Sequence, residues 1–379
     1  MAGKKLTMLF LGNIESPHTA KWVQYFADNG HNVHLVSYVP ASGIICQTTN
    51  INLHLIKRKI PINIWPFNTI LNFPFTLLKI NKLIGEISPD IIHAHYVTSY
   101  GHLAAFTGMR PFVLTAWGSD ILVTPKEYWL AKKIVKYVLR KADYITCDAG
   151  HMKNAMIDLG ADSSKIGIIN FGVDTRKFIS GVRNDKLKSE IGFSFKNKIV
   201  ISLRSLEQIY NIENLIKAIP EIIKSIPETR FIIIGSGTKE EELKKMADKL
   251  CPKGSFRFIG RVKNDDLPKY LNISDVYVST SLSDGGIAAS TAEAMACEVP
   301  VVITDSADNR NWVTDGVNGF IVPVRNSEML KKKVCQFLVD GDLRKKIGKA
   351  GRDIIIKKND YYNEMSKVEK IYYSLINKI

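Results

Sequence analysis

Short apolar segments alternate with amphipathic segments along the first half of the chain. The apolar residues recur at helical spacing over 20–30, and 125–141 has the pattern of a second helix. Short apolar runs of the kind that form buried strands occupy 6–13, 31–38, 52–58, 90–96, 112–118, 143–150 and 165–172. Strands that alternate with helices predict a parallel, doubly wound sheet.

The same alternation starts again near Lys198, with a helix expected over 240–250. Predicted strands of this second cycle occupy 198–204, 230–237, 256–262, 275–281 and 299–305. The pattern predicts an α/β protein of two Rossmann-like domains whose strand ends face each other across one cleft.

The predicted domains follow from these two cycles. We expect an N-terminal domain over 1–172, an interdomain segment over 173–197 and a C-terminal domain over 198–359. The stretch from about 340 onward is helical in pattern and has no strand partner. Its last part, about 360–379, is predicted to pack back onto the first domain.

Length and composition agree with this division. A chain of 379 residues exceeds one ordinary core, and 45% hydrophobic residues are typical of globular proteins. The first apolar run ends at Gly12 and is expected to be a strand rather than a signal peptide. The five cysteines have neither metal-ligand nor redox-motif spacing, which predicts reduced thiols and a cytoplasmic protein.

The segment from Ser281 to Asp305 carries the clearest chemical signal. Its pattern is strand end, glycine loop, helix with an acid, and apolar strand. A glycine loop before a helix leaves backbone N–H groups free for phosphate oxygens, and Glu293 lies where it can reach a ribose diol. The segment predicts a nucleotide-diphosphate site. Its loop and helix start comprise Asp284, Gly285, Gly286, Ile287, Ala288, Ala289 and Ser290.

Other residues at strand ends of the second domain are weaker candidates. Arg204 ends a strand where ligands bind, and its guanidinium can hold two phosphate oxygens, although a surface salt bridge is the alternative. Gly235 follows another strand, but a tight turn explains it equally well. Arg261 and Val262 are candidates for a base pocket.

In the first domain, the candidates for contacts with a second substrate cluster after three strands. His93 and His95 alternate onto the same face of one strand, where packed histidines are more common than catalytic ones. Trp117 can stack on a sugar ring or belong to the core. Further candidates for the same site are His18, Ser119 and Asp120, of which Asp120 has helix capping as its alternative role.

The net charge of +15 indicates an anionic partner. Basic and aromatic residues are dense over 125–142 and 56–80, which suits either a solvated helix face or an anionic membrane surface. Nucleic acid is the weaker partner because no nucleic-acid-binding signature is present.

These motifs resemble those of the retaining glycosyltransferases of the GT-B fold, family 4, the glycosyl transferase group 1 type. The similarity covers nearly the whole chain, and its most specific segment is AEAMACEVPVV. The resemblance implies that Glu293 holds the donor ribose hydroxyls and that Arg204 binds the diphosphate.

The chain departs from the family pattern at several positions. The first acid of the family's pair falls on Gly285, so that Asp284 is the nearest acid, and Tyr210 with Asn211 stands where Lys-Gly is usual. One positive charge is therefore missing, and Arg310 is a hypothetical replacement. Trp117 stands where many members have a histidine.

The resemblance implies a retaining transfer of a sugar from a UDP- or GDP-sugar to a hydroxyl of a glycan or lipid-linked saccharide. It implies no cofactor and no metal; the Asp-x-Asp of Asp340 and Asp342 is interpreted as a helix cap. His95 and Asp120 are candidates for acceptor contacts. An epimerase-like enzyme or a non-catalytic nucleotide-sugar binder is the alternative. The basic surface predicts a peripheral enzyme on the inner leaflet of the cell membrane, in polysaccharide or cell-envelope synthesis.

Overall fold

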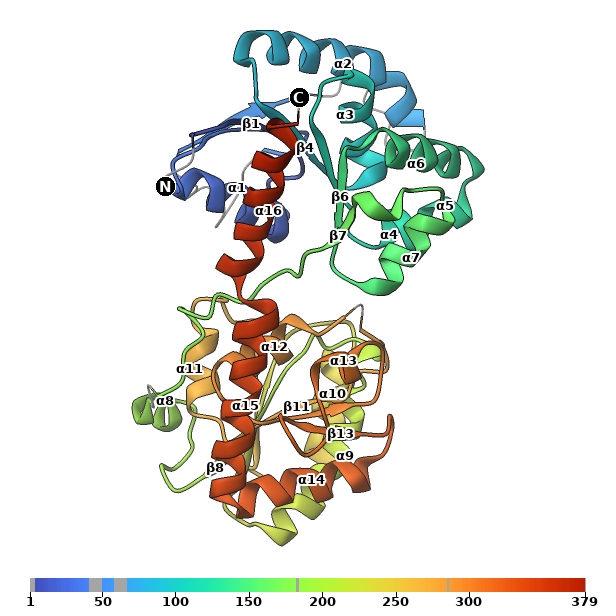
Figure 1. Ribbon diagram of the computed structural model, residues 1–379. Coiled ribbons are helices and arrows are strands. Elements are labelled where there is room, and N and C mark those ends of the chain that lie inside the picture. The colour runs from blue at the N-terminus through green and yellow to red at the C-terminus, as the bar shows by residue number, and fades with distance from the viewer. Residues whose placement is uncertain (1–3, 41–49, 58–66, 182–183, 285, 379) are drawn as a thin grey trace. The chain divides into compact units, whose positions relative to one another are not determined.

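The computed structural model describes residues 4–40, 50–57, 67–181, 184–284 and 286–378 (Figure 1). The chain divides into two compact units: unit 1 is Met1–Phe171 with Asn363–Ile379, and unit 2 is Gly172–Tyr362. Each unit is built on one parallel sheet, which confirms the predicted α/β fold of two Rossmann-like domains. Gly285 of the predicted phosphate loop and residues 58–66 of the second basic stretch lie outside the described residues.

Unit 1 has a sheet of seven strands within the described residues, in the order β3-β2-β1-β4-β5-β6-β7. All neighbouring strands pair in parallel. The strands are β1 Thr7–Leu11, β2 Asn32–Ser37, β3 Ile51–Leu55, β4 Ile91–His95, β5 Phe112–Thr115, β6 Tyr144–Cys147 and β7 Ile166–Ile168. The predicted strand over 165–172 is therefore shorter than expected, since regular pairing ends at Ile168.

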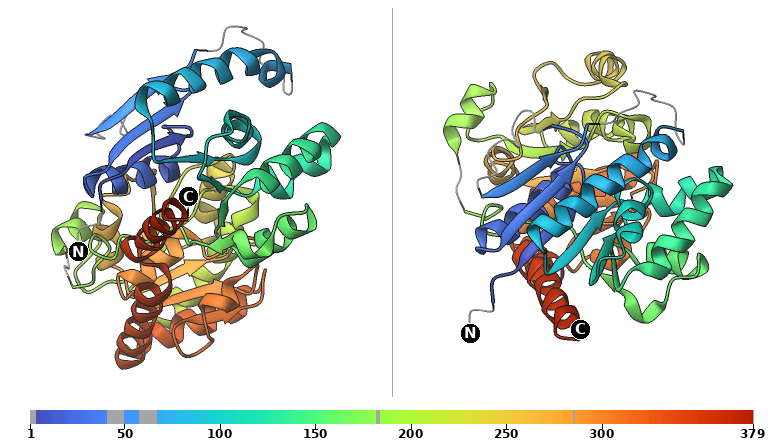
Figure 2. Two further views of the ribbon diagram at one scale, coloured as in Figure 1. Left: turned by 45° about the horizontal axis from the view of Figure 1, so that its top comes forward. Right: turned by 90° about the horizontal axis from the view of Figure 1, so that it is seen from above.

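Helices cover both faces of this sheet. Leu9, Leu114 and Val138 share one core with α2, α3 and α6, whereas Phe10 on the opposite face contacts Phe26 of α1. Figure 2 shows α2, α3 and α6 beside one another over one face. The helical segments are α1 Pro17–Asp28, α2 Phe67–Ile87, the π-helix η2 Val97–Gly101, α3 His102–Thr107, α4 Ser119–Leu122, α5 Thr124–Glu127, α6 Trp129–Lys141, α7 Gly150–Asp158 and the 3₁₀ turn η3 Ser163–Lys165.

The predicted single helix over 125–141 is two helices. Tyr128 between α5 and α6 is extended, with φ −132° and ψ 114°, and its geometry interrupts the helical hydrogen bonds. As a consequence, Trp129 is the first residue of a new helix, and its side chain is exposed there.

The last helix, α16 (Tyr361–Ile376), groups with unit 1 from Asn363 onward. Tyr372 is fully buried there, its hydroxyl hydrogen bonds to Nδ1 of His93, and its ring stacks on Phe26. Glu369 bonds to Nε2 of His31 at 2.9 Å. The helix thus closes the face of the sheet that α1 covers only in part.

Unit 2 repeats the strand pattern with six strands within the described residues, in the order β10-β9-β8-β11-β12-β13. These strands are β8 Lys198–Leu203, β9 Thr229–Ile234, β10 Phe256–Gly260, β11 Val276–Ser279, β12 Val301–Thr304 and β13 Phe320–Val322. The helical segments are α8 Asp185–Glu190, the 3₁₀ turn η4 Gln208–Tyr210, α9 Ile212–Ser225, α10 Glu240–Leu250, α11 Leu267–Asn272, α12 Ala289–Ala296, α13 Asn309–Trp312, α14 Ser327–Val339 and α15 Gly341–Asn359. Asp340 caps α15, since its carboxylate accepts from the Leu343 N–H, as predicted.

The strand order decides where a ligand can bind in each unit. In both sheets the order reverses beside the first strand, between β1 and β4 in unit 1 and between β8 and β11 in unit 2. At such a reversal the loops from neighbouring strands diverge to opposite faces and leave a crevice beyond the strand ends. Among the described residues, no helix is both long and apolar enough to span a bilayer.

Candidate active site

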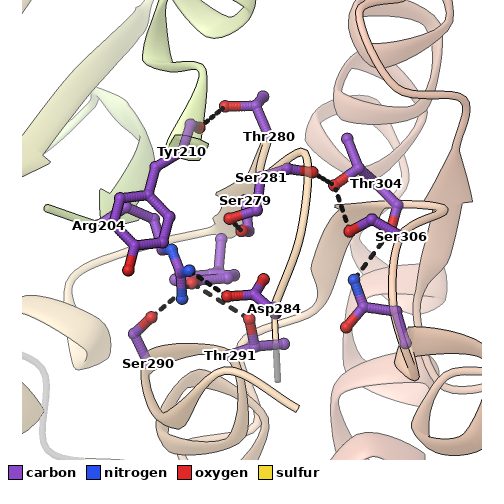
Figure 3. A network of polar contacts seen from close by, with 12 residues as sticks. Arg204, Tyr210, Ser279, Thr280, Ser281, Asp284, Ser290, Thr291, Thr304 and Ser306 are labelled. Carbon is purple, nitrogen blue, oxygen red and sulfur yellow. Dashed lines mark hydrogen bonds and ion pairs between the residues drawn. The ribbon is translucent and has the colours of Figure 1, made fainter. Parts of the chain in front are cut away.

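The reversal point of unit 2 brings Arg204 and Asp284 together (Figure 3). Arg204 follows β8 and Asp284 follows β11, and Nη2 of the arginine donates to Oδ1 of the aspartate in an ion pair. The two side chains are only 8% and 10% exposed. The guanidinium lies 4.2 Å from the centre of the Tyr210 ring, and its Nε is buried without a hydrogen-bond partner. Arg204 is thus fixed at the strand edge, and the Asp284 carboxylate occupies only one side of its guanidinium.

A network of hydroxyl groups fixes the loops around this pair. Thr280 Oγ1 donates to the carbonyl of Tyr210 at 3.0 Å, and Thr304 Oγ1 donates to the carbonyl of Ser281 (Figure 3). Thr280 Oγ1 also lies 2.8 Å from the carbonyl oxygen of Asn211. These side chains are fully or almost fully buried. They tie the end of β11 to its neighbours, which holds Asp284 in place. The run Ser-Thr-Ser at 279–281, which starts with the last residue of β11, was the available sequence signal for this network, and sequence reasoning missed it.

The helix α12 begins beside this network with an N-terminus that no side chain caps. Its N-cap is Ala288, and the hydroxyls of Ser290 and Thr291 instead bond to the buried Tyr277 hydroxyl, at 2.9 and 3.2 Å. The first N–H groups of the helix therefore keep their capacity to bind an anion.

Glu293 lies one turn into α12 and is 8% exposed. Its Oε1 accepts from Nδ2 of Asn264 at 2.9 Å, and Oδ1 of Asn264 in turn accepts from Nζ of Lys177 at 2.7 Å. The lysine fixes which way the amide points, so that its N–H₂ group faces the carboxylate. Asn264 and Lys177 are positioning residues that the sequence gave no reason to select.

The structure favours the structural alternative for Gly235. Its φ is +146°, and a Cβ there would lie 2.1 Å from the carbonyl oxygen of Arg204. The glycine therefore allows the end of β9 to pack against the backbone that carries Arg204. A Cβ on Gly286 would meet no atom within 4 Å, so its side of the loop is open.

The remaining predicted donor residues differ in their exposure. Ile287 is half-buried, Ala288 is buried and Ala289 is exposed at the start of α12. Arg261 is exposed and Val262 is half-buried after β10. Their roles stay predictions.

Arg310 does not offer a free positive charge in this structure. Its guanidinium makes two bonds to Asp305, with Nε to Oδ1 at 2.8 Å and Nη2 to Oδ2 at 2.6 Å. The Asp305 carboxylate, whose pKa this contact lowers, already neutralises the arginine. The hypothesis that Arg310 replaces the missing lysine therefore finds no support in its contacts.

The reversal point of unit 1 holds a cavity of about 350 Å³. Its walls come from the loops after β1, β2, β4 and β5, with Tyr96 and Tyr100 on one side and Trp117 on another. His95 also lines the cavity. The remaining lining residues are Asn13, Ser16, Thr19, Tyr38, Val39 and Ser99.

His95 presents an unused nitrogen among these residues. Its Nδ1 hydrogen bonds with Thr19 Oγ1 at 3.0 Å, while its buried Nε2 has no partner. Burial, aided by the charge of His18, lowers the pKa of His95 to about 3. The ring is therefore neutral at physiological pH and can form one more hydrogen bond. His93, by contrast, is bonded at both nitrogens, to Tyr372 and Thr115, and has a packing role.

Trp117 forms an aromatic platform with two neighbours. Its ring stacks on Phe171 at 5.3 Å and 7°, and His18 stacks on both rings at 5.0 and 4.5 Å. The structure therefore brings His18 and His95 into contact with Trp117, and their role in a shared acceptor site stays a prediction.

Asp120 has a different position from the one predicted for an acceptor contact. Its side chain is fully buried, Oδ2 accepts from the N–H of Val97, and Oδ1 accepts from the N–H groups of Trp117 and Gly118. The carboxylate does not cap α4 either, because the N-cap of that helix is Gly118 and no side chain caps it; Asp120 instead braces two cavity loops. Ser119 is exposed and hydrogen bonds with the Tyr96 hydroxyl at 2.6 Å.

Comparison with known proteins identifies the class. A family model for glycosyl transferases group 1 matches residues 183–354, and a model for glycosyl transferase 4-like domains matches residues 7–149. The two matches cover both units, so the chain belongs to the group 1 glycosyltransferases of the GT-B fold.

Individual relatives agree with this assignment. An uncharacterized glycosyltransferase, MJ1069 of Methanocaldococcus jannaschii, is 28% identical over 312 residues, which are 82% of this chain and 73% of the relative. A GDP-mannose-dependent alpha-(1-6)-phosphatidylinositol monomannoside mannosyltransferase of Mycolicibacterium smegmatis is 25% identical over 301 residues, 76% of this chain and 77% of the relative. The crystal structure of Anabaena Alr3699/HepE in complex with UDP has the same fold, with a TM-score of 0.77, 18% identity, and coverage of 98% of this chain and 100% of that one.

Proposed function

We propose that this glycosyltransferase moves a hexose-type sugar, with retention of configuration, from a UDP- or GDP-sugar to a hydroxyl of a glycan or lipid-linked saccharide. The donor binds to unit 2 and the acceptor to unit 1. The observation that carries the proposal is the meeting of an uncapped helix N-terminus, Arg204 and Glu293 at the reversal point of one sheet. The named relatives, one GDP-dependent and one crystallised with UDP, support both nucleotides as candidates.

The diphosphate in this proposal is held by two positive elements and opposed by one carboxylate. The α12 N-terminus carries a partial charge of roughly +0.5, and Arg204 carries a full charge that Asp284 now partly neutralises. A phosphate oxygen approaching the guanidinium therefore competes with Asp284. We infer that the donor displaces this carboxylate from Arg204, which frees Asp284 to face the sugar, close to where the family's first acid is expected.

The proton balance of the transfer follows from the pKa of His95. A ring with a pKa of about 3 is a poor base for a sugar hydroxyl at neutral pH, so it orients the hydroxyl through Nε2 without removing the proton. In the proposed same-face transfer, the bond from the anomeric carbon to the diphosphate breaks as the acceptor oxygen attacks. The acceptor proton goes to the leaving phosphate oxygen, whose new charge is stabilised by Arg204 and the helix N-terminus without a metal.

The second candidate is a nucleotide-sugar binder or epimerase-like protein without glycosyl transfer. The pairing of the site's arginine with an internal carboxylate favours it, because a protein with no need to stabilise a leaving group tolerates such a pair. The two candidates differ in turnover rather than in donor binding.

A thermal-shift panel of UDP- and GDP-sugars tests the donor site first. We expect one nucleotide sugar to raise the melting temperature of the native protein, and Arg204→Gln and Glu293→Gln each to reduce the shift strongly. Lys217→Gln, at an exposed position of α9 away from these residues, is the matched control and should keep it. An unchanged shift in both site variants would refute the donor site. Release of UDP or GDP that depends on an added glycan or lipid-linked acceptor separates the transferase from the binder.

A further inference from the structure

We propose that unit 1 binds the surface of an anionic lipid bilayer through the outer side of α6 and its neighbours. The α6 face is defined here by Trp129, Lys133, Tyr137 and Lys141 of α6, with Phe106 of α3. The bilayer is a partner additional to the substrates of the proposed function, and binding to it can be tested independently of that function.

The four α6 residues form one stripe because they are spaced four apart. Lys133 Nζ lies 4.9 Å from the centre of the Trp129 ring, and Lys141 Nζ lies 5.6 Å from that of Tyr137. Aromatic rings and ammonium groups thus alternate along about three turns. Trp129 is 71% exposed, whereas tryptophan side chains of globular proteins are on average highly buried.

Apolar side chains of two further helices continue the stripe sideways. The Phe106 ring stacks on Tyr137 with centres 4.8 Å apart, and Phe73 of α2 meets Phe106 edge-on at 5.0 Å. Phe106 nevertheless stays 46% exposed. The aromatic contacts therefore continue from α6 over α3 to α2, and these three helices lie side by side in Figure 2.

The charge of this face has a single sign. Residues 129–141 contain four lysines, one arginine and no acid, and no ion pair joins these five to a carboxylate of the described residues. Lysine is a point charge on a long apolar stem, which suits a diffuse layer of phosphates better than the paired oxygens that arginine prefers. Tryptophan and tyrosine prefer the depth of the lipid headgroups. Together these features match a bilayer with anionic lipids rather than a protein or a nucleic acid.

The position of Trp129 relates this face to the acceptor cavity. β5 leads into Trp117 of the cavity wall, and the chain continues through α4 and α5 directly to Trp129. Val123 and Tyr128 in this short connection are also exposed. The apolar end of the face is therefore at the same end of the sheet as the cavity, so a bilayer docked there brings a lipid-linked hydroxyl toward the acceptor site.

Vesicle flotation of the full chain tests the proposal. We expect binding to vesicles of phosphatidylcholine with 30% phosphatidylglycerol to exceed binding to pure phosphatidylcholine by roughly 100-fold, and to fall steeply in about 0.5 M salt. Replacing Lys133 and Lys141 by Gln should weaken binding roughly 25-fold, since each basic residue near an anionic surface accounts for about fivefold. Trp129→Ala should weaken it roughly tenfold.

A matched control exists in unit 2. Phe195 is also 71% exposed, and Lys196 Nζ lies 5.8 Å from its ring, so Phe195→Ala with Lys196→Gln removes a similar aromatic–lysine pair. This control should float like the native protein. Equal binding to neutral and anionic vesicles, or a control variant as weak as the α6 variants, would overturn the proposal. Loss of a dimer in the α6 variants by analytical ultracentrifugation would instead assign the face to a second copy and also overturn it.

The donor readout keeps this test separate from the proposed function. All variants of the α6 face should keep the full thermal shift with the nucleotide sugar, because the substituted residues belong to unit 1 and the proposed donor site belongs to unit 2. Lost flotation with an intact donor shift supports the bilayer proposal. Unaffected flotation with an intact donor shift refutes it and leaves the proposed function in place.

Discussion

Replacing Asp284 by Asn tests whether the buried carboxylate competes with the donor for Arg204. In the ligand-free structure the two side chains form an ion pair that is 8% and 10% exposed. A hydrogen bond to a charged partner contributes about 1.5–3 kcal/mol, against about 1 kcal/mol for a neutral one. Removing the charge of Asp284 should therefore release about 1–2 kcal/mol of competition and tighten UDP or GDP binding roughly five- to thirtyfold.

The same change should destabilise the ligand-free protein. Arg204 stays buried above the Tyr210 ring and loses its counter-charge, and breaking a buried pair on one side costs up to about 3–5 kcal/mol. The asparagine retains an oxygen that can accept from Nη2, so we expect about 1–3 kcal/mol here. The variant should thus combine a lower melting temperature without ligand with a larger shift when nucleotide is added.

Titration calorimetry with UDP and GDP, together with denaturant unfolding, measures both effects. Asp305→Asn is the matched control, because Asp305 pairs with Arg310 in the same unit but the pair is exposed, at 40% and 67%. We expect this control to change neither affinity nor stability measurably. If Asp284→Asn binds nucleotide no better than the native protein, the carboxylate positions Arg204 rather than competes for it, and our reasoning is wrong.

Three further predictions concern Glu293, the glycines Gly235 and Gly286, and the buried histidines. Glu293→Gln should weaken donor binding roughly ten- to 100-fold in calorimetry with little loss of melting temperature, because the amide keeps an oxygen but loses the charge that grips the ribose diol. Gly235→Ala should lower the free energy of unfolding by about 2–4 kcal/mol, since its Cβ meets the Arg204 carbonyl, whereas Gly286→Ala should leave stability unchanged within about 0.5 kcal/mol. Burial lowers the pKa of His95 to about 3 and that of His102 to about 4, so both stay neutral in the folded protein while the unfolded chain takes up protons below pH 6.5. The free energy of unfolding should therefore decrease as the pH is lowered from about 6 to 4, by about 1.4 kcal/mol per pH unit for each ring. In urea unfolding, His102→Gln should lose less stability over this pH range, by the contribution of one ring.

Local patterns were sufficient for most of the secondary structure. The period of apolar residues located every described strand except β13, and helices such as α1 and α10, because a buried strand and an amphipathic helix each have a pattern visible within ten residues. It did not locate the long helix α2. The pattern failed where the backbone conformation of a single residue ends a helix. At Tyr128, for example, the extended backbone separates α5 from α6. Nothing in the residues around 125–141 shows this break.

The candidate site was predicted only in its outline. Glu293 and the loop before α12 were found because a glycine loop, a small-faced helix and an acid lie within one continuous segment. The contacts of Asp120 with three backbone N–H groups, and the chain from Lys177 through Asn264 to Glu293, join residues that are far apart in sequence or have no distinctive pattern.

The sequence by itself determined that the chain forms two parallel α/β units and that one segment of the second unit suits a diphosphate. Only the tertiary structure decided the strand order, and with it the two reversal points at which Arg204 meets Asp284 and His95 meets Trp117. The physical reason is that side-chain periodicity reports which face of an element is buried. The order of the strands in each sheet depends on packing between segments that are distant in sequence, and these contacts do not produce a periodic pattern in the sequence.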